Sequence, residues 1–233
     1  MDANGIHSGN PVILSARNIH KHFGKLHVLK GVDIDIPRGE VVSIVGPSGA
    51  GKTTLLQILG TLLLPDNNHY KLSINGLELN QLSGNKLSDF RNRHIGFIFQ
   101  FHYLLPELTA LENTALPAYI AGVSKKEADR KAETWLRKVG LAERLHHLPA
   151  QLSGGEQQRV AVARALVNNP DIVFADEPSG NLDTANAAKL HRLFFDLQEQ
   201  TGTTFVIVTH NPELAGMSHR IYHMQDGKIT DNK

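Results

Sequence analysis

The sequence predicts an α/β fold with a parallel β-sheet at its core, an N-terminal antiparallel β subdomain and an inserted α-helical subdomain. The core prediction rests on three short β-branched runs, residues 41–45, 172–175 and 204–208, which are typical of strands buried on both faces. Helical segments, residues 159–168 and 187–200, precede the second and third runs. Such alternation favours a parallel sheet, and ligands of these sheets collect beyond the carboxyl ends of the strands.

The antiparallel subdomain is predicted from the first part of the chain. Residues 11–36 contain short alternating stretches such as 12–14 and 32–36. Alternation of apolar and polar residues is typical of strands with one buried face. We therefore expect an antiparallel sheet beside the main one.

The helical subdomain is predicted from a change of pattern. Strand signals stop between about residues 100 and 165, and residues 125–139 place apolar side chains three and four positions apart, as on one face of a helix. We therefore expect a single domain over residues 11–233, with a core formed by 11–99 and 166–233 and the helical subdomain formed by 100–165.

Composition excludes several classes of function. The chain has 233 residues with a formal net charge of +1, which gives no support to a nucleic-acid surface. The sequence has no cysteine, so disulfides and thiolate metal sites are excluded. His20, His22 and His27 are close together in sequence, but no carboxylate or cysteine accompanies them there. We therefore do not expect a metal site at these histidines.

The N-terminal segment predicts that the chain stays in the cytoplasm. Residues 1–18 carry an early Asp2 and lack the basic region and apolar core of a signal peptide. The longest uncharged apolar-rich run, residues 53–65, is far shorter than the roughly 20 residues that a membrane-spanning helix needs. Any association with a membrane is therefore expected to go through a partner.

Residues 46–53, GPSGAGKT, match the phosphate-loop pattern G-x-x-x-x-G-K-[ST] and stand between a predicted strand and a predicted helix, as this pattern requires. This indicates a P-loop NTPase (RecA-like) core that binds ATP and Mg²⁺. We expect successive amides to wrap the β-phosphate, Lys52 to span the β- and γ-phosphates, and the Thr53 hydroxyl to ligate Mg²⁺. The candidate nucleotide-binding residues here are Gly46, Pro47, Ser48, Gly49, Ala50, Gly51, Lys52, Thr53 and Thr54.

Two carboxylates, Asp176 and Glu177, follow the second core run directly, so they emerge at the sheet edge where the phosphates are expected. Asp176 is expected to hold the magnesium shell through water. Glu177 is the candidate general base for the attacking water. The alternative is a solvated turn that happens to carry two acids.

Two further polar residues follow strand ends. His210 comes after the third core run and is expected to reach the γ-phosphate and orient the attacking water, although a lone histidine is more often structural. Gln100 follows Ile98 and Phe99 where the helical subdomain begins, and its amide oxygen is a candidate Mg²⁺ ligand. Gln100 would then act as a sensor between the nucleotide and the inserted helices.

The stretch Ser153-Gly154-Gly155-Glu156 allows two interpretations. It fits the S-x-x-E capping box, which closes a helix N-terminus without any ligand. Glycine at both middle positions costs roughly 1 kcal/mol each relative to alanine, however, and bare amides at a helix start are suited to an anion. The residues themselves favour a ligand only slightly over a simple cap.

Taken in order along the chain, these motifs resemble those of the nucleotide-binding subunits of ATP-binding-cassette (ABC) transporters, from about residue 12 to about residue 230. The resemblance implies a homodimer packed head to tail, in which Ser153, Gly154 and Gly155 bind the γ-phosphate held by the other subunit. It also implies that Asp183 lies at the same interface and that Phe23 stacks on adenine.

Residues 95–113 and 175–183 are similar to the ATPases of lipoprotein-releasing systems. This implies ATP-driven dimer closure on the cytoplasmic face of the bacterial inner membrane, with integral membrane permease subunits that release lipoproteins towards the outer membrane. Cassettes of macrolide-type efflux pumps and of a cell-division complex share Gly-Asn-Leu-Asp and remain alternatives. Ser179 replaces the usual threonine, and residues 146–150 lack the usual arginine, which leaves the coupling there open.

ABC ATPases that do not take part in transport are less consistent with this sequence. Chromosome and repair clamps insert a long coiled coil between the phosphate loop and the family's signature, which here is residues 152–156 at the start of a predicted helix, and no sustained heptads occur in this sequence. Ribosomal members carry two cassettes in one chain, and this chain has one phosphate loop. The apolar residues 101–116 are expected to dock on the membrane partner, with core packing as the alternative.

Overall fold

The computed structural model describes residues 10–66 and 69–232. Within these residues the strands form a six-stranded sheet, in the order β10-β9-β3-β8-β7-β6, and a four-stranded sheet, in the order β2-β1-β4-β5. The first sheet contains β3 (Val41–Val45), β6 (Ile95–Ile98), β7 (Ile172–Asp176), β8 (Thr204–Val208), β9 (Arg220–Gln225) and β10 (Lys228–Asn232). The second contains β1 (Val12–Phe23), β2 (Leu26–Pro37), β4 (Lys71–Ile74) and β5 (Leu77–Glu78).

The three predicted core strands are confirmed as β3, β7 and β8, and they pair in parallel. Their side chains alternate between two hydrophobic cores because successive residues of a strand point to opposite faces. In β8, Val206 and Val208 join the core that faces β1 and β2, whereas Phe205 and Ile207 join the core that faces the helices. Burial on both faces explains why these runs are continuously apolar.

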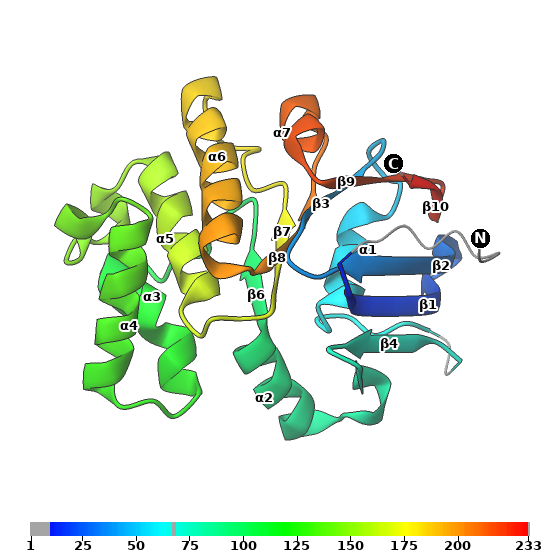
Figure 1. Cartoon of the computed structure of the whole chain (residues 1–233), viewed down its shortest axis with the longest axis horizontal. Coiled ribbons are helices and arrows are strands. Elements are labelled where there is room, and N and C mark those ends of the chain that lie inside the picture. The colour runs from blue at the N-terminus through cyan, green and yellow to red at the C-terminus, as the bar shows by residue number, and fades with distance from the viewer. Residues whose placement is uncertain (1–9, 67–68, 233) are drawn as a thin grey trace.

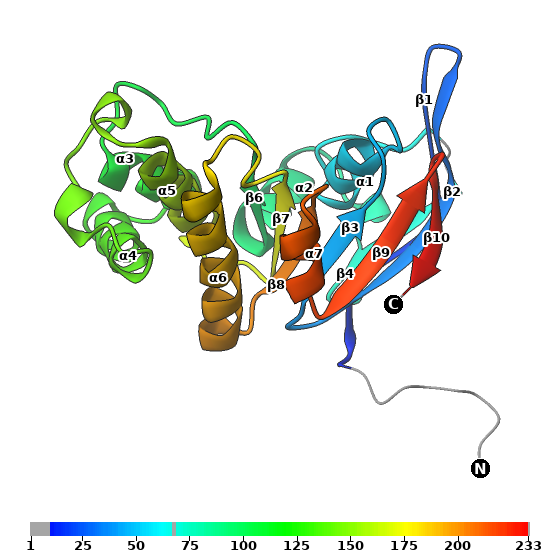
Figure 2. The ribbon, with the colours of Figure 1, turned by 90° about the horizontal axis from the view of Figure 1, so that it is seen from above.

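The predicted antiparallel sheet is also confirmed, but its first two strands are longer than the sequence indicates. β1 and β2 form a hairpin from the Val12–Pro37 pair to the Phe23–Leu26 pair. In Figure 2 this hairpin rises beside α1 (Lys52–Leu59), and its tip extends beyond the rest of the sheet. β4 lines the other edge of β1.

Helices gather mainly on one side of the parallel sheet. Figure 1 shows α3 (Ala110–Ile120), α4 (Lys125–Lys138) and α5 (Gly154–Leu166) together on the left, and α6 (Thr184–Thr201) and α7 (Pro212–Met217) along the sheet. The described residues also form α2 (Gly84–His94) and short 3₁₀ helices at Leu79–Gln81, Ala142–Arg144 and Pro149–Gln151. The predicted helix at 125–139 is confirmed as α4, while the exact subdomain boundaries remain a prediction.

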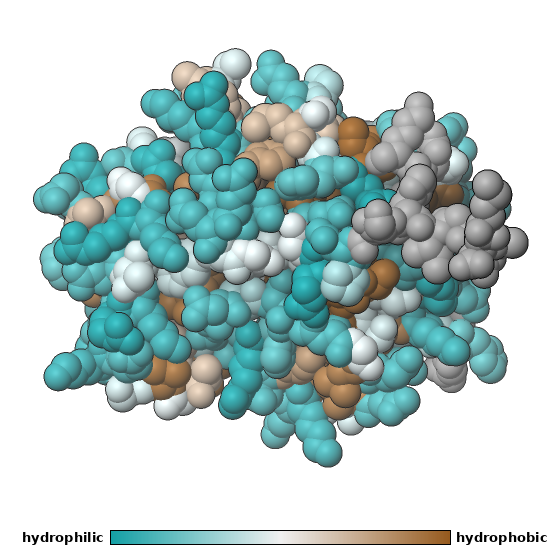
Figure 3. Space-filling model, viewed as in Figure 1, coloured by the Kyte–Doolittle hydropathy of each residue, from teal (hydrophilic) through white to brown (hydrophobic). Residues whose placement is uncertain are grey.

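The face of the molecule in Figure 3 is mainly hydrophilic, with hydrophobic residues in small scattered patches. Over the described part of the chain, none of the helices combines the length and the apolar character needed to cross a membrane.

Candidate active site

The phosphate loop links β3 to α1, and its backbone requires glycine. Gly51 has a φ of 100°, a left-handed conformation that residues with a side chain rarely adopt. A Cβ on Gly46 would lie 2.0 Å from the carbonyl oxygen of Met224 in β9, so the loop is pressed against this strand. The first amides of α1 have no acceptor within the helix, and they are therefore suited to bind a phosphate.

The Lys52 ammonium lies across this loop. Its Nζ donates to the carbonyl oxygens of Gly46 (2.8 Å) and Pro47 (3.0 Å), and the residue is 9% exposed. An ammonium has three donors and can exchange a carbonyl partner for a phosphate oxygen. The loop thus holds its cation at the place where the β- and γ-phosphates are expected.

Thr53 and Asp176 form an oxygen pair beside the loop. The Thr53 hydroxyl donates to Asp176 Oδ1 at 3.0 Å. Burial raises the pKa of Asp176, and the nearby negative charge of Glu177 adds to this effect. A carboxylate and a hydroxyl are hard oxygen ligands, and a divalent cation would stabilise the charge of the partly buried carboxylate. These residues therefore fit the expected Mg²⁺.

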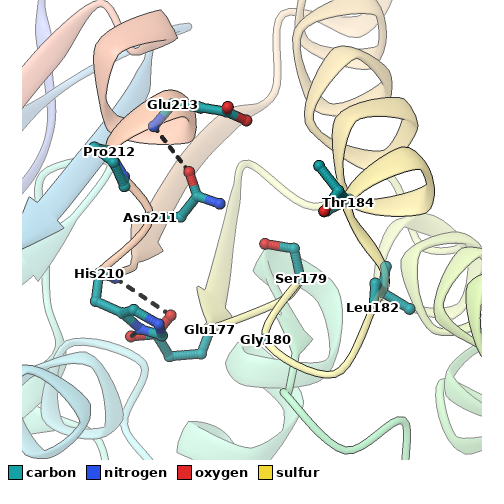
Figure 4. A pocket seen from close by; sticks show the side chains of 10 residues that line it. Glu177, Ser179, Gly180, Leu182, Thr184, His210, Asn211, Pro212 and Glu213 are labelled. Atoms are coloured by element: carbon teal, nitrogen blue, oxygen red, sulfur yellow. Dashed lines mark hydrogen bonds and ion pairs between the residues drawn. The ribbon is translucent and has the colours of Figure 1, made fainter.

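Glu177 is held in an unusual conformation at the end of β7. Its φ is +44°, which costs roughly 1–2 kcal/mol for a residue with a side chain. Its amide donates to the carbonyl oxygen of Val208 in β8 (2.9 Å). The carboxylate contacts His210 twice, through Oε1 to Nδ1 (2.8 Å) and through Oε2 to the backbone amide (3.3 Å). The structure therefore brings the two predicted catalytic residues together (Figure 4).

A cavity of about 340 Å³ opens beside this pair. In Figure 4, Ser179 and Asn211 point into it from opposite sides, from the turn after β7 and the start of α7. The cavity is lined by Glu177, Ser179, Gly180, Leu182, Thr184, Ala187, His210, Asn211, Pro212 and Glu213. Water can therefore approach Glu177 from this side.

Gln100 contacts the turn after β7. Its Nε2 donates to Asn181 Oδ1 (3.3 Å), and Asn181 Nδ2 donates in return to the Gln100 carbonyl oxygen (3.0 Å). The chain that follows is held by α5, because Arg164 donates to the carbonyl oxygens of His102 and Tyr103 (both 2.7 Å). Gln100 thus connects the inserted helices to the Glu177 turn, while its expected contact with Mg²⁺ remains a prediction.

The predicted capping box at the start of α5 is present. Glu156 accepts from the Ser153 amide (2.8 Å) and hydroxyl (2.9 Å), and the Glu156 amide donates to Ser153 Oγ (3.3 Å). These bonds to Ser153 and a further one from Arg144 (2.9 Å) lower the pKa of Glu156 to about 2. The helix start is therefore closed by Glu156 in its ionised form.

The two glycines of this stretch have different surroundings. A Cβ on Gly155 would lie 3.2 Å from Asn186 in α6, so close helix packing accounts for this glycine. A Cβ on Gly154 would meet Leu182 at 4.0 Å and nothing nearer. Asn186 in turn donates to Asp183, the exposed N-cap of α6, through its amide (2.9 Å) and Nδ2 (2.6 Å). Gly154 is thus the glycine that packing within the chain leaves unexplained.

Comparison with known proteins identifies the family. A family model described as ABC transporter matches residues 29–180. The chain belongs to the ABC transporter family. It is similar to the lipoprotein-releasing system ATP-binding protein LolD of Bacteroides fragilis, at 58% identity over 93% of this chain and 100% of the relative, and to that of Porphyromonas gingivalis, at 59% identity over 94% and 99%. The resemblance found in the sequence is confirmed, and the chain is an ABC ATP-binding subunit of the LolD type.

Solved structures of cassettes have the same fold. The dimeric cassette MJ0796 in a post-hydrolysis state with ADP and Pi superposes with a TM-score of 0.85, at 39% identity, covering 94% of this chain and 97% of that one. The predicted fold class is confirmed, and ATPase activity follows from membership of this family.

The signature helix and the phosphate loop of this cassette lie apart. Figures 1 and 2 both show α5 in the helical group on the left and α1 on the right, with strands of the parallel sheet between them. Phe23 is 52% exposed at the tip of the β1–β2 hairpin, and Gly51 packs against Val28 and Leu29 farther along that hairpin. Phe23, the side chain expected to stack on adenine, therefore belongs to a hairpin that packs beside the phosphate loop.

The three N-terminal histidines come together across the hairpin. His20 Nδ1 lies 3.2 Å from His27 Nε2, and His22 stacks on His27 with ring centroids 3.8 Å apart. One expectation needs correction: a carboxylate does accompany them, because Asp66 Oδ2 lies 3.1 Å from His22 Nδ1. In the residues that the structure describes, no group of three or more histidine, cysteine or acidic side chains could hold a metal ion.

Sequence reasoning missed two side chains that contact the turn beginning at Glu177. Gln158 of α5 and His191 of α6 are both buried and contact Pro178 and Ser179 of this turn. Neither residue belongs to a pattern that the sequence alone singles out as functional. The available signal was a polar residue at a core position of each helix.

Proposed function

We propose that this cassette is the ATPase subunit of a lipoprotein-releasing transporter. It works as a homodimer on the cytoplasmic face of the bacterial inner membrane and binds integral membrane permease subunits. The observation that carries the cargo assignment is identity of 58% and 59%, over more than nine tenths of this chain, to two proteins named as lipoprotein-releasing ATP-binding subunits. A macrolide-type pump and a cell-division complex are the competing assignments.

The residues of one chain divide the reaction between them. The phosphate-loop amides and Lys52 would bind the β- and γ-phosphates, and Thr53 with Asp176 would hold Mg²⁺. When bound there, Mg²⁺ would supply positive charge against the charge that develops on the transferring phosphoryl group. Glu177 accepts the proton of the attacking water. His210, whose Nδ1 contacts Glu177, would present its other ring nitrogen to the γ-phosphate.

The complete site needs a second chain. Gly154 and Gly155 offer helix-start amides, with Ser153 as the N-cap of α5, at a place remote from the phosphate loop of their own chain. A head-to-tail dimer would bring these amides to the γ-phosphate held by the partner and Asp183 to the same interface. The solved cassette MJ0796 is described as dimeric, which supports this arrangement.

A groove beside β6 is suited to the permease. It has a volume of about 520 Å³ and exposes Tyr103 (66%) and Ile120 (75%). Of the apolar segment 101–116, Phe101 and Leu105 are exposed, whereas Ala110 and Ala115 are buried in the core. The docking surface is therefore the first part of that segment together with the groove, and core packing accounts for the second part.

Affinity purification of the cassette from its native membrane, with mass spectrometry of the bound proteins, tests this assignment. Permease subunits with large extracytoplasmic domains, recovered together with lipoproteins, are the expected result. Recovery of efflux-pump or division-site proteins in their place would support one of the competing assignments. Recovery of soluble partners alone would contradict the transporter assignment.

A further inference from the structure

A buried histidine of α6 contacts the turn that carries Glu177. His191 is 1% exposed, and its Nε2 lies 2.9 Å from the hydroxyl oxygen of Ser179, which is itself 8% exposed. Burial lowers the pKa of His191, which favours the neutral imidazole with one donor and one acceptor nitrogen. A hydrogen bond between two buried polar groups holds both in one orientation.

Ser179 belongs to a tight turn that begins at the proposed catalytic base. The amide of Gly180 donates to the Glu177 carbonyl oxygen (3.0 Å) and closes this turn. Its two central residues, Pro178 and Ser179, are each held by a side chain from a different helix. Gln158 of α5 donates to the Pro178 carbonyl oxygen (2.7 Å), and His191 of α6 contacts the Ser179 hydroxyl.

This support matters because the Glu177 backbone is strained. Its φ of +44° is unfavourable for a residue with a side chain, and such conformations persist only when the surrounding structure enforces them. The hydrogen bond from Gly180 and the bonds to Pro178 and Ser179 all act within three residues of Glu177. Without them the carboxylate could rotate away from the water it is to activate.

We propose that His191 is a positioning residue for ATP hydrolysis, which holds the Glu177 carboxylate in its reactive orientation through Ser179. The inference rests on the proposed role of Glu177. The competing explanation is that the two buried polar groups merely satisfy each other and contribute to stability alone. These explanations differ in what they predict for turnover.

The test measures ATP hydrolysis and thermal unfolding of the full-length chain in four variants. His191→Phe removes the hydrogen bond and keeps a ring, Ser179→Ala removes the hydroxyl partner, and the double variant removes both. His191→Gln retains an amide donor near the Nε2 position. Phe194→Leu, a fully buried change on the same helix, serves as the control for stability.

We expect His191→Phe and Ser179→Ala each to lower kcat about tenfold with KM for ATP within about twofold of wild type. The double variant should lose no more than either single variant, because both remove one interaction. His191→Gln should recover most of the turnover, and Phe194→Leu should lower Tm alone. If His191→Phe does not fold, Ser179→Ala and His191→Gln still decide the outcome.

Two results would overturn the inference: kcat of His191→Phe and Ser179→Ala within about twofold of wild type, or losses that multiply in the double variant. Glu177→Gln is measured in parallel. Undiminished hydrolysis by Glu177→Gln would refute the role of Glu177 itself, whereas inactive Glu177→Gln with active His191→Phe would refute the role of His191 alone.

Discussion

The carboxylate of Glu177 contacts two nitrogen atoms of His210, the backbone amide nitrogen and Nδ1 of the ring. The two side chains differ in exposure, at 18% for Glu177 and 74% for His210. The acid is thus shielded while the imidazole faces solvent. This arrangement fixes the carboxylate at the sheet edge and leaves the histidine accessible to a nucleotide.

Replacement of the base should separate binding from turnover. Glu177→Gln keeps the side-chain shape but cannot accept a proton, so we expect ATP binding to persist and kcat to fall by about 10²- to 10⁴-fold. An ATP-bound dimer should accumulate because hydrolysis no longer opens it. Nucleotide binding assays, steady-state hydrolysis and size-exclusion chromatography measure these effects. Hydrolysis at the wild-type rate would exclude Glu177 as the base.

The Thr53–Asp176 pair leads to a prediction about magnesium. Asp176→Asn removes the charge that stabilises the cation and its water shell, and changes at such positions typically cost 10- to 100-fold in metal affinity. We expect the Mg²⁺ concentration that supports half-maximal hydrolysis to rise by at least about tenfold. A magnesium titration of ATP hydrolysis checks this. An unchanged midpoint would mean that Asp176 does not contribute to the metal site.

The groove beside β6 can be tested without touching the ATP site. Ile120→Asp places a charge on an exposed apolar position of the groove, so permease binding should weaken at least about tenfold while the isolated cassette hydrolyses ATP normally. Leu77→Asp, at a 45% exposed position on β5 outside the groove, is the matched control. Quantitative co-purification with the permease measures the effect. Equal retention of permease by both variants would mean that the partner docks elsewhere.

The capping box of α5 predicts a defined acid sensitivity. The pKa of Glu156 falls from an ordinary value of 4.5 to about 2, so its ionised form stabilises the folded state above about pH 4.5. That contribution should be lost as the pH falls from about 4.5 to about 2, because the folded-state carboxylate then takes up its proton. The difference in unfolding free energy between wild type and Glu156→Gln, measured against pH, should shrink over this range. A difference that does not vary with pH would contradict the assignment.

The strands of the parallel core were predictable because buried parallel strands require continuous β-branched runs. β9 was not predicted, although residues 220–225 alternate as a strand with one buried face does, and this strand takes its place by pairing in parallel with β3. The positions of Glu177 and His210 were predictable because each follows the end of a core strand. The contacts of His191 and Gln158 were not predictable, because they join residues 12 and 20 positions apart through packing that has no local period.

Gly155 shows a different limit of sequence reasoning. A glycine next to a capping serine suggests bare amides for a ligand, and the contact with Asn186 supplies a packing reason that only the folded chain reveals. Packing within the chain does not explain Gly154, and α5 lies far from the phosphate loop of its own chain. Both observations support a site shared between two chains, so this interpretation depends on the second chain.

Mixing two inactive variants tests that shared site most directly. Lys52→Ala disables the phosphate loop and Ser153→Arg disables the signature, so neither variant alone should hydrolyse ATP. If each site combines the loop of one chain with the signature of the other, a mixed dimer contains one intact site. Equal mixing should then restore up to about a quarter of wild-type turnover, because about half of the dimers are mixed and each has one complete site. Turnover no higher than the sum of the separate variants would show that each chain uses its own signature.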